Sequence, residues 1–258
     1  MKDNDKHDLA VIFSYHKVDD VTLRNLQVFK DNNPDIPVIL VSNGGETMPC
    51  SLNTKNLLKG AWAKYRYHAR FMKVRHIRYL WHLLKNGTPK EYYWSNADLP
   101  IYIAYDASRE QVQADRYIHL EWDCYCNVDL REFYKEVWNA DLGARHVIDP
   151  ASDPDWVFFG EKYSQTYPSK AAANVCGAAP FAGVLLSDRA LSLICEELKN
   201  DVGWRTTFCE LRLGTLAKLL NLDIQELPEY KKKFLRGELP CWELSEINEP
   251  AVWHMVKN

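Results

Sequence analysis

RYIHLEWDCYC, residues 116–126, is a short strand that runs directly into two carboxylates. Two sets of side chains alternate along its first seven residues, with the period of two that a strand imposes. Glu121 and Asp123 therefore project from the carboxyl end of a strand. In an open α/β sheet ligands bind at that end, because the loops there vary while the strands hold them rigidly.

Carboxylates in this position suggest a site for a metal ion. Hard oxygen ligands suit Mg²⁺ or Mn²⁺ carrying a substrate diphosphate. The alternative is that Glu121 and Asp123 are merely solvated acids at the end of a strand. The segment alone leaves both interpretations open.

Strands alternate with helices along the rest of the chain, which predicts an α/β domain over residues 1–258 with a mostly parallel sheet flanked by helices. Asp19 or Asp20 is expected to cap the first helix, and Ser187 with Asp188 a later one. Strands are expected at 9–14, 37–41, 116–122, 181–186 and 222–227. Helices are expected at 20–32, 129–139, 188–199 and 209–220, and irregular stretches at 92–105, which contains Pro100, and 149–180.

The composition is that of a folded chain able to bury a sizeable core, with 47% hydrophobic residues among 258. Seven scattered cysteines with no secretory signal before them favour a reducing cytosol, so a cytoplasmic location is expected. Cys124 and Cys126 form a pair, but no second pair stands at zinc-like spacing, so small buried side chains are favoured over structural zinc. No apolar run approaches the roughly 20 residues that cross a bilayer.

The net charge of −3 hides an uneven distribution, because no acidic residue occurs between Thr47 and Lys90 while ten lysines and arginines do. Such a segment predicts an anionic neighbour: a nucleotide diphosphate, an anionic lipid surface, a nucleic acid or the protein's own acidic loops. An amphipathic helix with a solvated cationic face is the alternative. Nucleic acid is not expected, since no recognised binding module accompanies the charges. Residues 55–90 are thus a candidate for peripheral membrane contact.

In their order along the chain these landmarks resemble the GT-A glycosyltransferase superfamily, which implies a Rossmann-like GT-A fold. Glu121-Trp122-Asp123 resembles the D-x-D motif of that superfamily in an E-x-D form. The resemblance implies that Asp123 binds Mn²⁺ or Mg²⁺, with Glu121 at the metal, at a water or at the ribose. His254, in the late sequence WHMVK, resembles a further metal ligand, and Lys257 resembles the lysine that follows it near the phosphates.

A second landmark is Glu210 in the sequence CELRLG, residues 209–214. It resembles the helix start at which inverting members place the base that takes the proton of the acceptor hydroxyl. The positive end of the helix dipole is expected to keep Glu210 ionised. A helix-initiating carboxylate with no chemistry is the alternative. Residues 180–187 resemble the segment that borders the acceptor pocket.

The resemblance also implies where the donor nucleotide binds. Such enzymes hold the nucleoside at the ends of the first two strands, and an acid after the basic segment offers a hydrogen bond to base or ribose, or else caps a loop. Cations on a helix face offer contacts to the diphosphate. The expected nucleotide contacts are Ser14, His16, Asn43, Asp98, Arg70 and Lys73. Nothing in these residue types identifies the base; a UDP-sugar is the donor expected.

The sequence therefore predicts a metal-dependent glycosyltransferase that moves a sugar from a nucleotide-sugar donor to a hydroxyl of a glycan or glycolipid, with inversion at the anomeric carbon. A nucleotidyltransferase of similar fold is the nearest rival, although residues 14–20 lack the Gly- and Arg-rich loop such an enzyme needs. A sugar-nucleotide-binding protein that has lost turnover is the other. The sugar, the acceptor, the linkage and the oligomeric state are left open.

Overall fold

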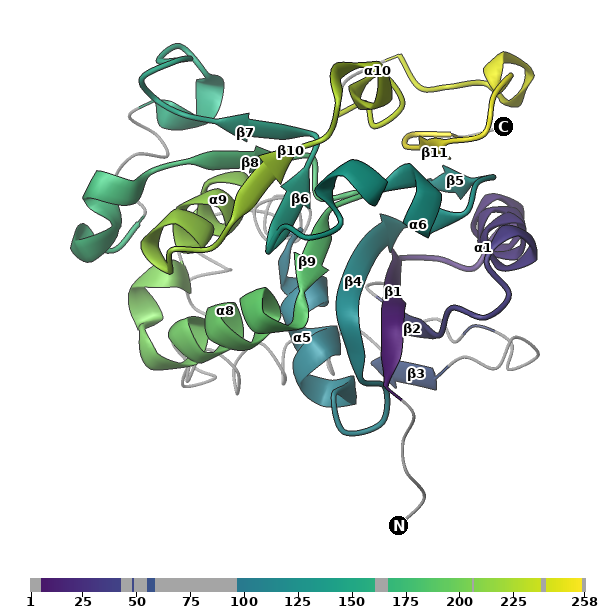
Figure 1. Ribbon diagram of the computed structural model, residues 1–258, viewed down its shortest axis with the longest axis horizontal. Coiled ribbons are helices and arrows are strands. Elements are labelled where there is room, and N and C mark those ends of the chain that lie inside the picture. The colour runs from purple at the N-terminus through teal and green to yellow at the C-terminus, as the bar shows by residue number, and fades with distance from the viewer. Residues whose placement is uncertain are drawn as a thin grey trace.

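The protein is a mixed α/β structure in which a central sheet is covered by helices (Figure 1). A computed structural model describes residues 6–42, 48, 55–58, 97–160, 167–205, 207–237 and 240–256. Most of the basic segment 55–90 lies outside these residues. Among the described helices none combines the length and the apolar character that a membrane crossing requires.

The predicted sheet is confirmed, and its strands are mostly parallel. In spatial order it runs β10-β6-β9-β4-β1-β2-β3. The neighbours are parallel except that β9 runs antiparallel to both β4 and β6. The strands are β1 (His7–Tyr15), β2 (Val38–Ser42), β3 (Lys55–Leu58), β4 (Ala114–Glu121), β6 (Leu142–Ala144), β9 (Leu185–Ser187) and β10 (Ile224–Glu226).

Alternation along β1 divides the core between the two faces of the sheet. Ala10 and Ile12 belong to one buried cluster, and Leu9, Val11 and Phe13 belong to the other. Both sets are fully buried, as the continuous apolar sequence of a central parallel strand requires. The first face is covered by α5 (Leu99–Ser108), α8 (Asp188–Asn200) and α9 (Cys209–Leu219), the second by α1 (Asp20–Asn32) and α6 (Leu130–Phe133).

The predicted helix caps are confirmed. The Asp19 carboxylate accepts hydrogen bonds from the backbone N–H of Thr22 at 3.0 Å and from its hydroxyl at 2.8 Å. At the start of α8 the Ser187 hydroxyl accepts from the N–H of Ala190 at 2.9 Å. Both side chains satisfy donors that the first helical turn leaves open.

The prediction of loop and short elements at 92–105 was wrong for its second half, which forms most of α5. Pro100 lies in the first turn of this helix, where its missing N–H costs no hydrogen bond. The helix is also apolar on nearly all sides because it is buried almost completely, so it carries no helical period in its polarity.

Elsewhere the predicted boundaries shift. The helix expected at 129–139 breaks into α6 and a 3-10 turn, Lys135–Val137. In its described residues, 149–160 and 167–180, the segment expected to be irregular consists mostly of turns and borders a two-stranded sheet. The remaining elements are β5 (Tyr125–Cys126), β7 (His146–Ile148), β8 (Gly177–Ala179), α10 (Glu229–Lys232) and β11 (Val252–Trp253), with 3-10 turns at Val157–Phe159, Ser169–Asn174, Val202–Arg205 and Leu244–Glu246.

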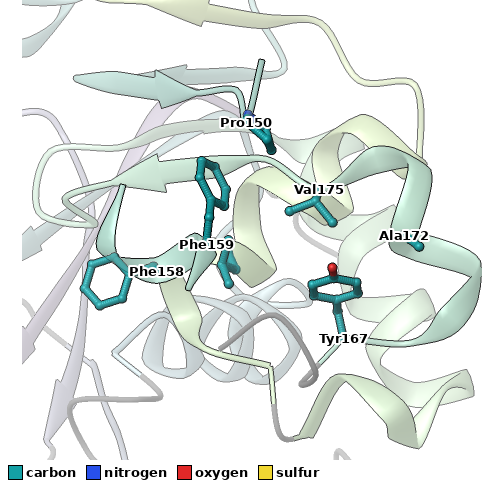
Figure 2. A pocket seen from close by; sticks show the side chains of 7 residues that line it. Pro150, Phe158, Phe159, Tyr167, Ala172 and Val175 are labelled. Atoms are coloured by element: carbon teal, nitrogen blue, oxygen red, sulfur yellow. The ribbon is translucent and has the colours of Figure 1, made fainter. Parts of the chain in front are cut away.

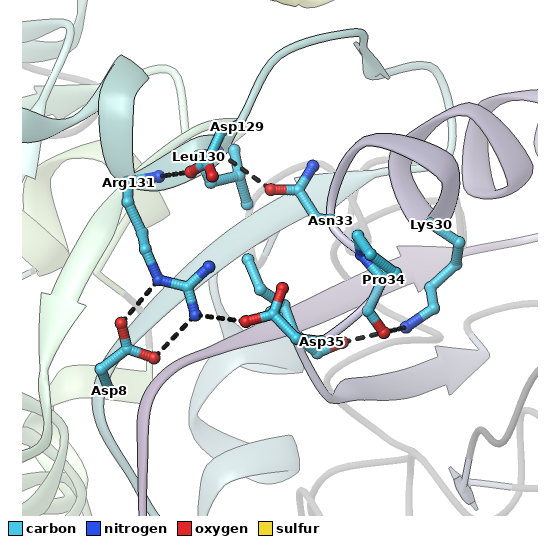
Figure 3. A network of polar contacts seen from close by, with 9 residues as sticks. Asp8, Lys30, Asn33, Pro34, Asp35, Asp129, Leu130 and Arg131 are labelled. Carbon is cyan, nitrogen blue, oxygen red and sulfur yellow. Dashed lines mark hydrogen bonds and ion pairs between the residues drawn. The ribbon is translucent and has the colours of Figure 1, made fainter.

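A polar network holds the chain that follows β5 against the start of β1 and the end of α1 (Figure 3). Arg131 donates to both oxygens of Asp8, at 2.6 and 2.8 Å, and to Asp35 at 2.9 Å. The buried amide of Asn33 accepts from the N–H of Leu130 at 2.9 Å and donates to the carbonyl of Val128 at 3.0 Å. These contacts fix the path of the chain shortly after Glu121 and Asp123.

The loop before β9 packs tightly against β4. Gly183 has φ of +79°, a conformation that favours glycine. Its N–H donates to the carbonyl of His119 at 2.7 Å, and its own carbonyl accepts from the Tyr134 hydroxyl at 2.7 Å. A Cβ at this position would lie 2.7 Å from Leu235 Cδ2.

We expect Gly183→Ala to lower the free energy of unfolding by about 1–3 kcal/mol, because it combines an unfavourable backbone conformation with overpacking. Gly237→Ala is the control, since a Cβ there would meet its nearest atom at 3.7 Å. Urea unfolding followed by circular dichroism measures both. Equal stabilities for the two variants would contradict the packing described for Gly183.

Candidate active site

Three predicted site residues meet at the carboxyl end of β4. Glu121 ends the strand, Asp123 follows in the next turn, and His254 comes from the C-terminal segment. His254 Nε2 lies 3.7 Å from Glu121 Oε2 and 3.6 Å from Asp123 Oδ1. One ligand atom from each residue falls within 4.8 Å of the other two.

Backbone pairing on both sides of His254 places it there. In front of it, β11 pairs antiparallel with β5, with Val252 opposite Cys126. Behind it, the N–H of Val256 donates to the carbonyl of Asp123 at 3.0 Å. The C-terminal segment is thereby attached to the same turn that carries the metal-binding carboxylate expected from the sequence.

Aromatic packing supports this attachment. The ring of Trp253, which is almost completely buried, lies edge-on to those of Phe234 and Trp242, each at 4.8 Å between centroids. The guanidinium of Arg236 lies 3.3 Å from the centre of the Trp242 ring. These contacts join the segment around His254 to the buried cluster on the second face of the sheet.

Hydrogen bonding orients the imidazole of His254. Its Nδ1 is bonded to the backbone carbonyl of Arg236. A carbonyl only accepts, so Nδ1 carries the hydrogen and Nε2 is the atom that faces the two carboxylates. Metal-ligating histidines are held in the same way by a second partner on the other ring nitrogen.

Charge dominates the chemistry of the three residues. Burial alone would raise the pKa of Glu121, but its hydrogen bond to His254 and the histidines nearby bring it below its usual value. Burial would lower the pKa of His254, and the two carboxylates raise it instead. The two carboxylates thus favour a proton on Nε2, and a divalent cation can take the place of that proton between them.

The donor set fits such a cation. Two carboxylates and one imidazole nitrogen give three ligands, which leaves further coordination positions for phosphate oxygens. Carboxylates suit both Mg²⁺ and Mn²⁺, whereas an imidazole ligand favours a transition metal. Mn²⁺ is accordingly the better match of the two ions expected from the sequence.

His119 is a site residue that sequence reasoning missed. It is buried two residues before Glu121 on the same face of β4. Its Nδ1 bonds the carbonyl of Phe181 at 3.1 Å, so its Nε2, 2.9 Å from the Ser14 hydroxyl, accepts that proton. Burial lowers the pKa of His119 against the opposing influence of Glu121. The period of two that predicted β4 was the signal that could have found it.

Ser14 and His16 occupy different positions at the end of β1. Ser14 pairs in register with Glu121 and is buried, with its hydroxyl directed at His119. His16 is exposed, and its ring meets Trp122 edge-on at 4.7 Å. His16 also stands near enough to Glu121 to help lower the pKa of that carboxyl. Their contacts to a nucleoside stay predictions.

Glu210 begins α9, as the sequence predicts, and its side chain is partly buried. Burial raises its pKa to about 7. Desolvation thus opposes the ionisation of Glu210 that the helix start was expected to favour. A pKa near neutrality is the value that suits a general base at physiological pH.

Asp98 is fully buried beside the start of α5 and forms an ion pair with Arg212, which is also fully buried. Both oxygens of Asp98 face Arg212. Its predicted contact with base or ribose stays a prediction. The remaining predicted nucleotide contacts lie outside the described residues: Asn43, Arg70, Lys73 and Lys257.

A pocket of about 240 Å³ opens next to the first turn of α9 (Figure 2). It shares Leu211, the neighbour of Glu210 in the chain, with that turn. Phe158 stacks on Phe208 at 4.3 Å between ring centres, which ties the pocket wall to the residue that precedes the helix. The residues that line it are mostly of apolar type: Pro150, Phe158, Phe159, Tyr167, Ala172, Val175 and Leu211.

Comparison with solved structures finds glycosyltransferases at low sequence identity. No family model and no curated protein sequence matches the chain. Among solved structures, the galactosyltransferase LgtC in complex with donor and acceptor sugar analogues is 13% identical over 84% of this chain and 72% of that chain, with a TM-score of 0.38. An active-site mutant of LgtC gives 13% identity over 95% of this chain and 86% of that one, with a TM-score of 0.40.

The glycosyltransferase GlyE of Streptococcus pneumoniae TIGR4 is 12% identical, with a TM-score of 0.39. The match covers 98% of this chain but 55% of GlyE, so the chain spans about half the length of that protein. TM-scores of this size leave the donor, the acceptor and the mechanism to be argued from the site itself.

We expect His254→Ala to weaken Mn²⁺ binding about 10-fold or more, because it removes one of three ligands. Titration calorimetry with Mn²⁺ measures the change. His146→Ala on β7 is the control, since that histidine belongs to no group of three ligands among the described residues. Unchanged Mn²⁺ affinity in the His254 variant would remove this residue from the site.

Proposed function

We propose that the protein is a metal-dependent glycosyltransferase of GT-A fold, which moves a sugar from a nucleotide-sugar donor to an acceptor hydroxyl. The observation that carries the proposal is the convergence of Glu121, Asp123 and His254 at the carboxyl end of β4, a central strand of the mostly parallel sheet. Ligands of α/β sheets bind at that edge. The resemblance of Glu121-Trp122-Asp123 to the D-x-D motif supports the same assignment.

In this proposal Glu121, Asp123 and His254 hold Mn²⁺ or Mg²⁺, and the surrounding chain orients these side chains. When bound, the cation neutralises the charge that develops on the leaving diphosphate. Glu121 and Asp123 provide anionic oxygens, while the carbonyl of Arg236 keeps His254 in the tautomer that a metal ligand needs. His119 is held neutral and buried, which fixes the end of β4 against β1.

Glu210 is the proposed general base. With a pKa of about 7 it is largely ionised slightly above neutrality and still basic enough to take the proton of an acceptor hydroxyl. Direct attack by that hydroxyl on the anomeric carbon inverts its configuration. The acceptor is proposed to be a glycan or a glycolipid.

The donor is proposed to be a UDP-sugar whose nucleoside lies near Ser14 and His16. The proposed contacts are completed by Asn43, which follows β2 in the sequence, by Arg70 and Lys73 of the basic segment, and by Lys257. A cytoplasmic location, with residues 55–90 against an anionic membrane, fits a lipid-linked acceptor.

A thermal-shift screen tests the donor half of the proposal. A UDP-sugar with Mn²⁺ should raise the melting temperature of the protein, because a ligand selective for the folded state stabilises it. Asp123→Asn should abolish the shift, since an amide replaces an anionic ligand oxygen, whereas Asp153→Asn in the turn before Trp156 should keep it. A shift that persists in Asp123→Asn would show that the donor does not bind at this metal site.

Glu210→Gln should reduce kcat by about 10² or more while donor affinity stays near normal, because glutamine keeps the shape but cannot accept a proton. Glu196→Gln, an exposed position on α8, is the matched control. Product configuration read by NMR completes the test. Retention at the anomeric carbon, or normal turnover of the Glu210 variant, contradicts a base at Glu210.

The raised pKa of Glu210 sets the direction of the pH dependence. Turnover should fall as pH drops below about 7, where the carboxylate becomes protonated. Stability moves the other way: burial favours the neutral form, so the contribution of Glu210 is full below its ordinary pKa and is lost as pH rises through about 7. Glu210→Gln should therefore stabilise the fold more at pH 8.5 than at pH 4.5, measured by thermal unfolding.

A further inference from the structure

Arg212 is a charged side chain in the centre of the protein. It lies two residues after Glu210 on α9 and is fully buried. Its Nε donates to Asp98 Oδ2 at 2.8 Å and its Nη2 to Asp98 Oδ1. Its Nη1 donates to the backbone carbonyls of Trp204 at 3.1 Å and Thr207 at 3.2 Å.

A pair of this kind is a weak source of stability. Both charges lose their hydration, and the attraction between them roughly offsets that loss. An apolar pair of similar volume would hold the same elements together at least as well. The fork of directional hydrogen bonds is what an apolar pair cannot supply, so geometry is the property that distinguishes this arrangement.

The bonds of Arg212 converge on the start of α9. Phe208 stands at the N-cap and has no side-chain atom that could cap the helix. The carbonyls that Arg212 holds belong to the turn immediately before it, and Trp204 in that turn is anchored to Glu197 of α8 at 2.8 Å. Asp98 adds the start of α5. Arg212 therefore links the start of α9 to α5 directly and to α8 through Trp204.

We propose that Asp98 and Arg212 are positioning residues that fix the first turn of α9, and with it Glu210, relative to the start of α5 and the turn before α9. This inference rests on the proposed function only in giving Glu210 a chemical role. In it, neither residue acts by touching substrate. Asp98 acts through Arg212, which differs from the nucleoside contact that the sequence suggested.

The test replaces the pair with apolar side chains of similar size, Asp98→Leu with Arg212→Met. We expect a folded protein whose Mn²⁺ and donor affinities stay within about twofold, while kcat falls about 10-fold or more because the base is misplaced. Arg212→Lys keeps the charge but not the forked guanidinium, so its kcat should lie between those of the native protein and the double variant. Glu132→Leu with Lys135→Met, which removes an exposed ion pair, is the control.

A mutant cycle separates positioning from mere stability. Adding Glu210→Gln should cost less kcat in the apolar double variant than in the native chain, because a misplaced base has less to lose. Additive effects, or full kcat in the folded double variant, overturn the proposal. Loss of donor affinity with kcat preserved overturns it as well and assigns Asp98 to the nucleoside. If the double variant does not fold, Arg212→Lys provides the same cycle.

One readout does not depend on activity. The pH dependence of the stability change caused by Glu210→Gln reports the pKa of Glu210, which is about 7 in the native chain. In the double variant, or in Arg212→Lys, we expect this pKa to fall toward the ordinary value, since a loosened helix start lets water reach the carboxylate. An unchanged pKa of Glu210 overturns the positioning proposal, whatever the catalytic role of Glu210. A lowered pKa with unaffected turnover supports the positioning and contradicts the assignment of Glu210 as the base.

Discussion

The candidate site depends on a short stretch of backbone pairing. β11 against β5, and the bond from Val256 to Asp123, carry a distant part of the chain to the end of β4. Without that pairing the two carboxylates would stand at a strand end with no third ligand, as they do in the bland interpretation of the sequence. The pairing involves few residues, so its strength comes from what surrounds it: Trp253 is buried between aromatic rings, and the chain after β5 is fastened through Asn33 and Arg131.

Each half of the site manages its buried charge differently. At the metal half, anions and an imidazole face one another, so the protonated histidine and a divalent cation are alternative ways to satisfy the same carboxylates. At the proposed base, burial raises the pKa of Glu210 to about 7. The pKa of Glu121 is lowered and that of Glu210 is raised because their surroundings differ. A lowered pKa suits a carboxylate that binds a cation, and a raised pKa suits a carboxylate that accepts a proton.

Sequence patterns predicted the parts of this structure that depend on local periodicity and capping. The two-residue alternation of 116–122 located β4 and both acids, and Asp19 and Ser187 marked helix starts through their side-chain chemistry. The missed parts depend on tertiary contacts. Helix α5 is apolar on nearly all sides because it is buried, so its sequence showed a proline and aromatics but no helical period. The resemblance could order His254 after the acids, whereas its approach to them required the fold.

Arg212 illustrates the same limit in the site. A cation within an apolar helix reads as a solvated side chain unless its partner is known, and Asp98 is separated from it by more than a hundred positions. Once the two are paired, the position of Glu210 has a physical explanation that its own residue type lacks: the turn before α9 is held by a guanidinium whose other bonds are to a helix on the sheet. The metal half is built from backbone pairing and the base half from a buried charge. The proposed metal ligands and the proposed base therefore depend on different interactions: the first on strand pairing with the C-terminal segment, the second on the ion pair between Asp98 and Arg212.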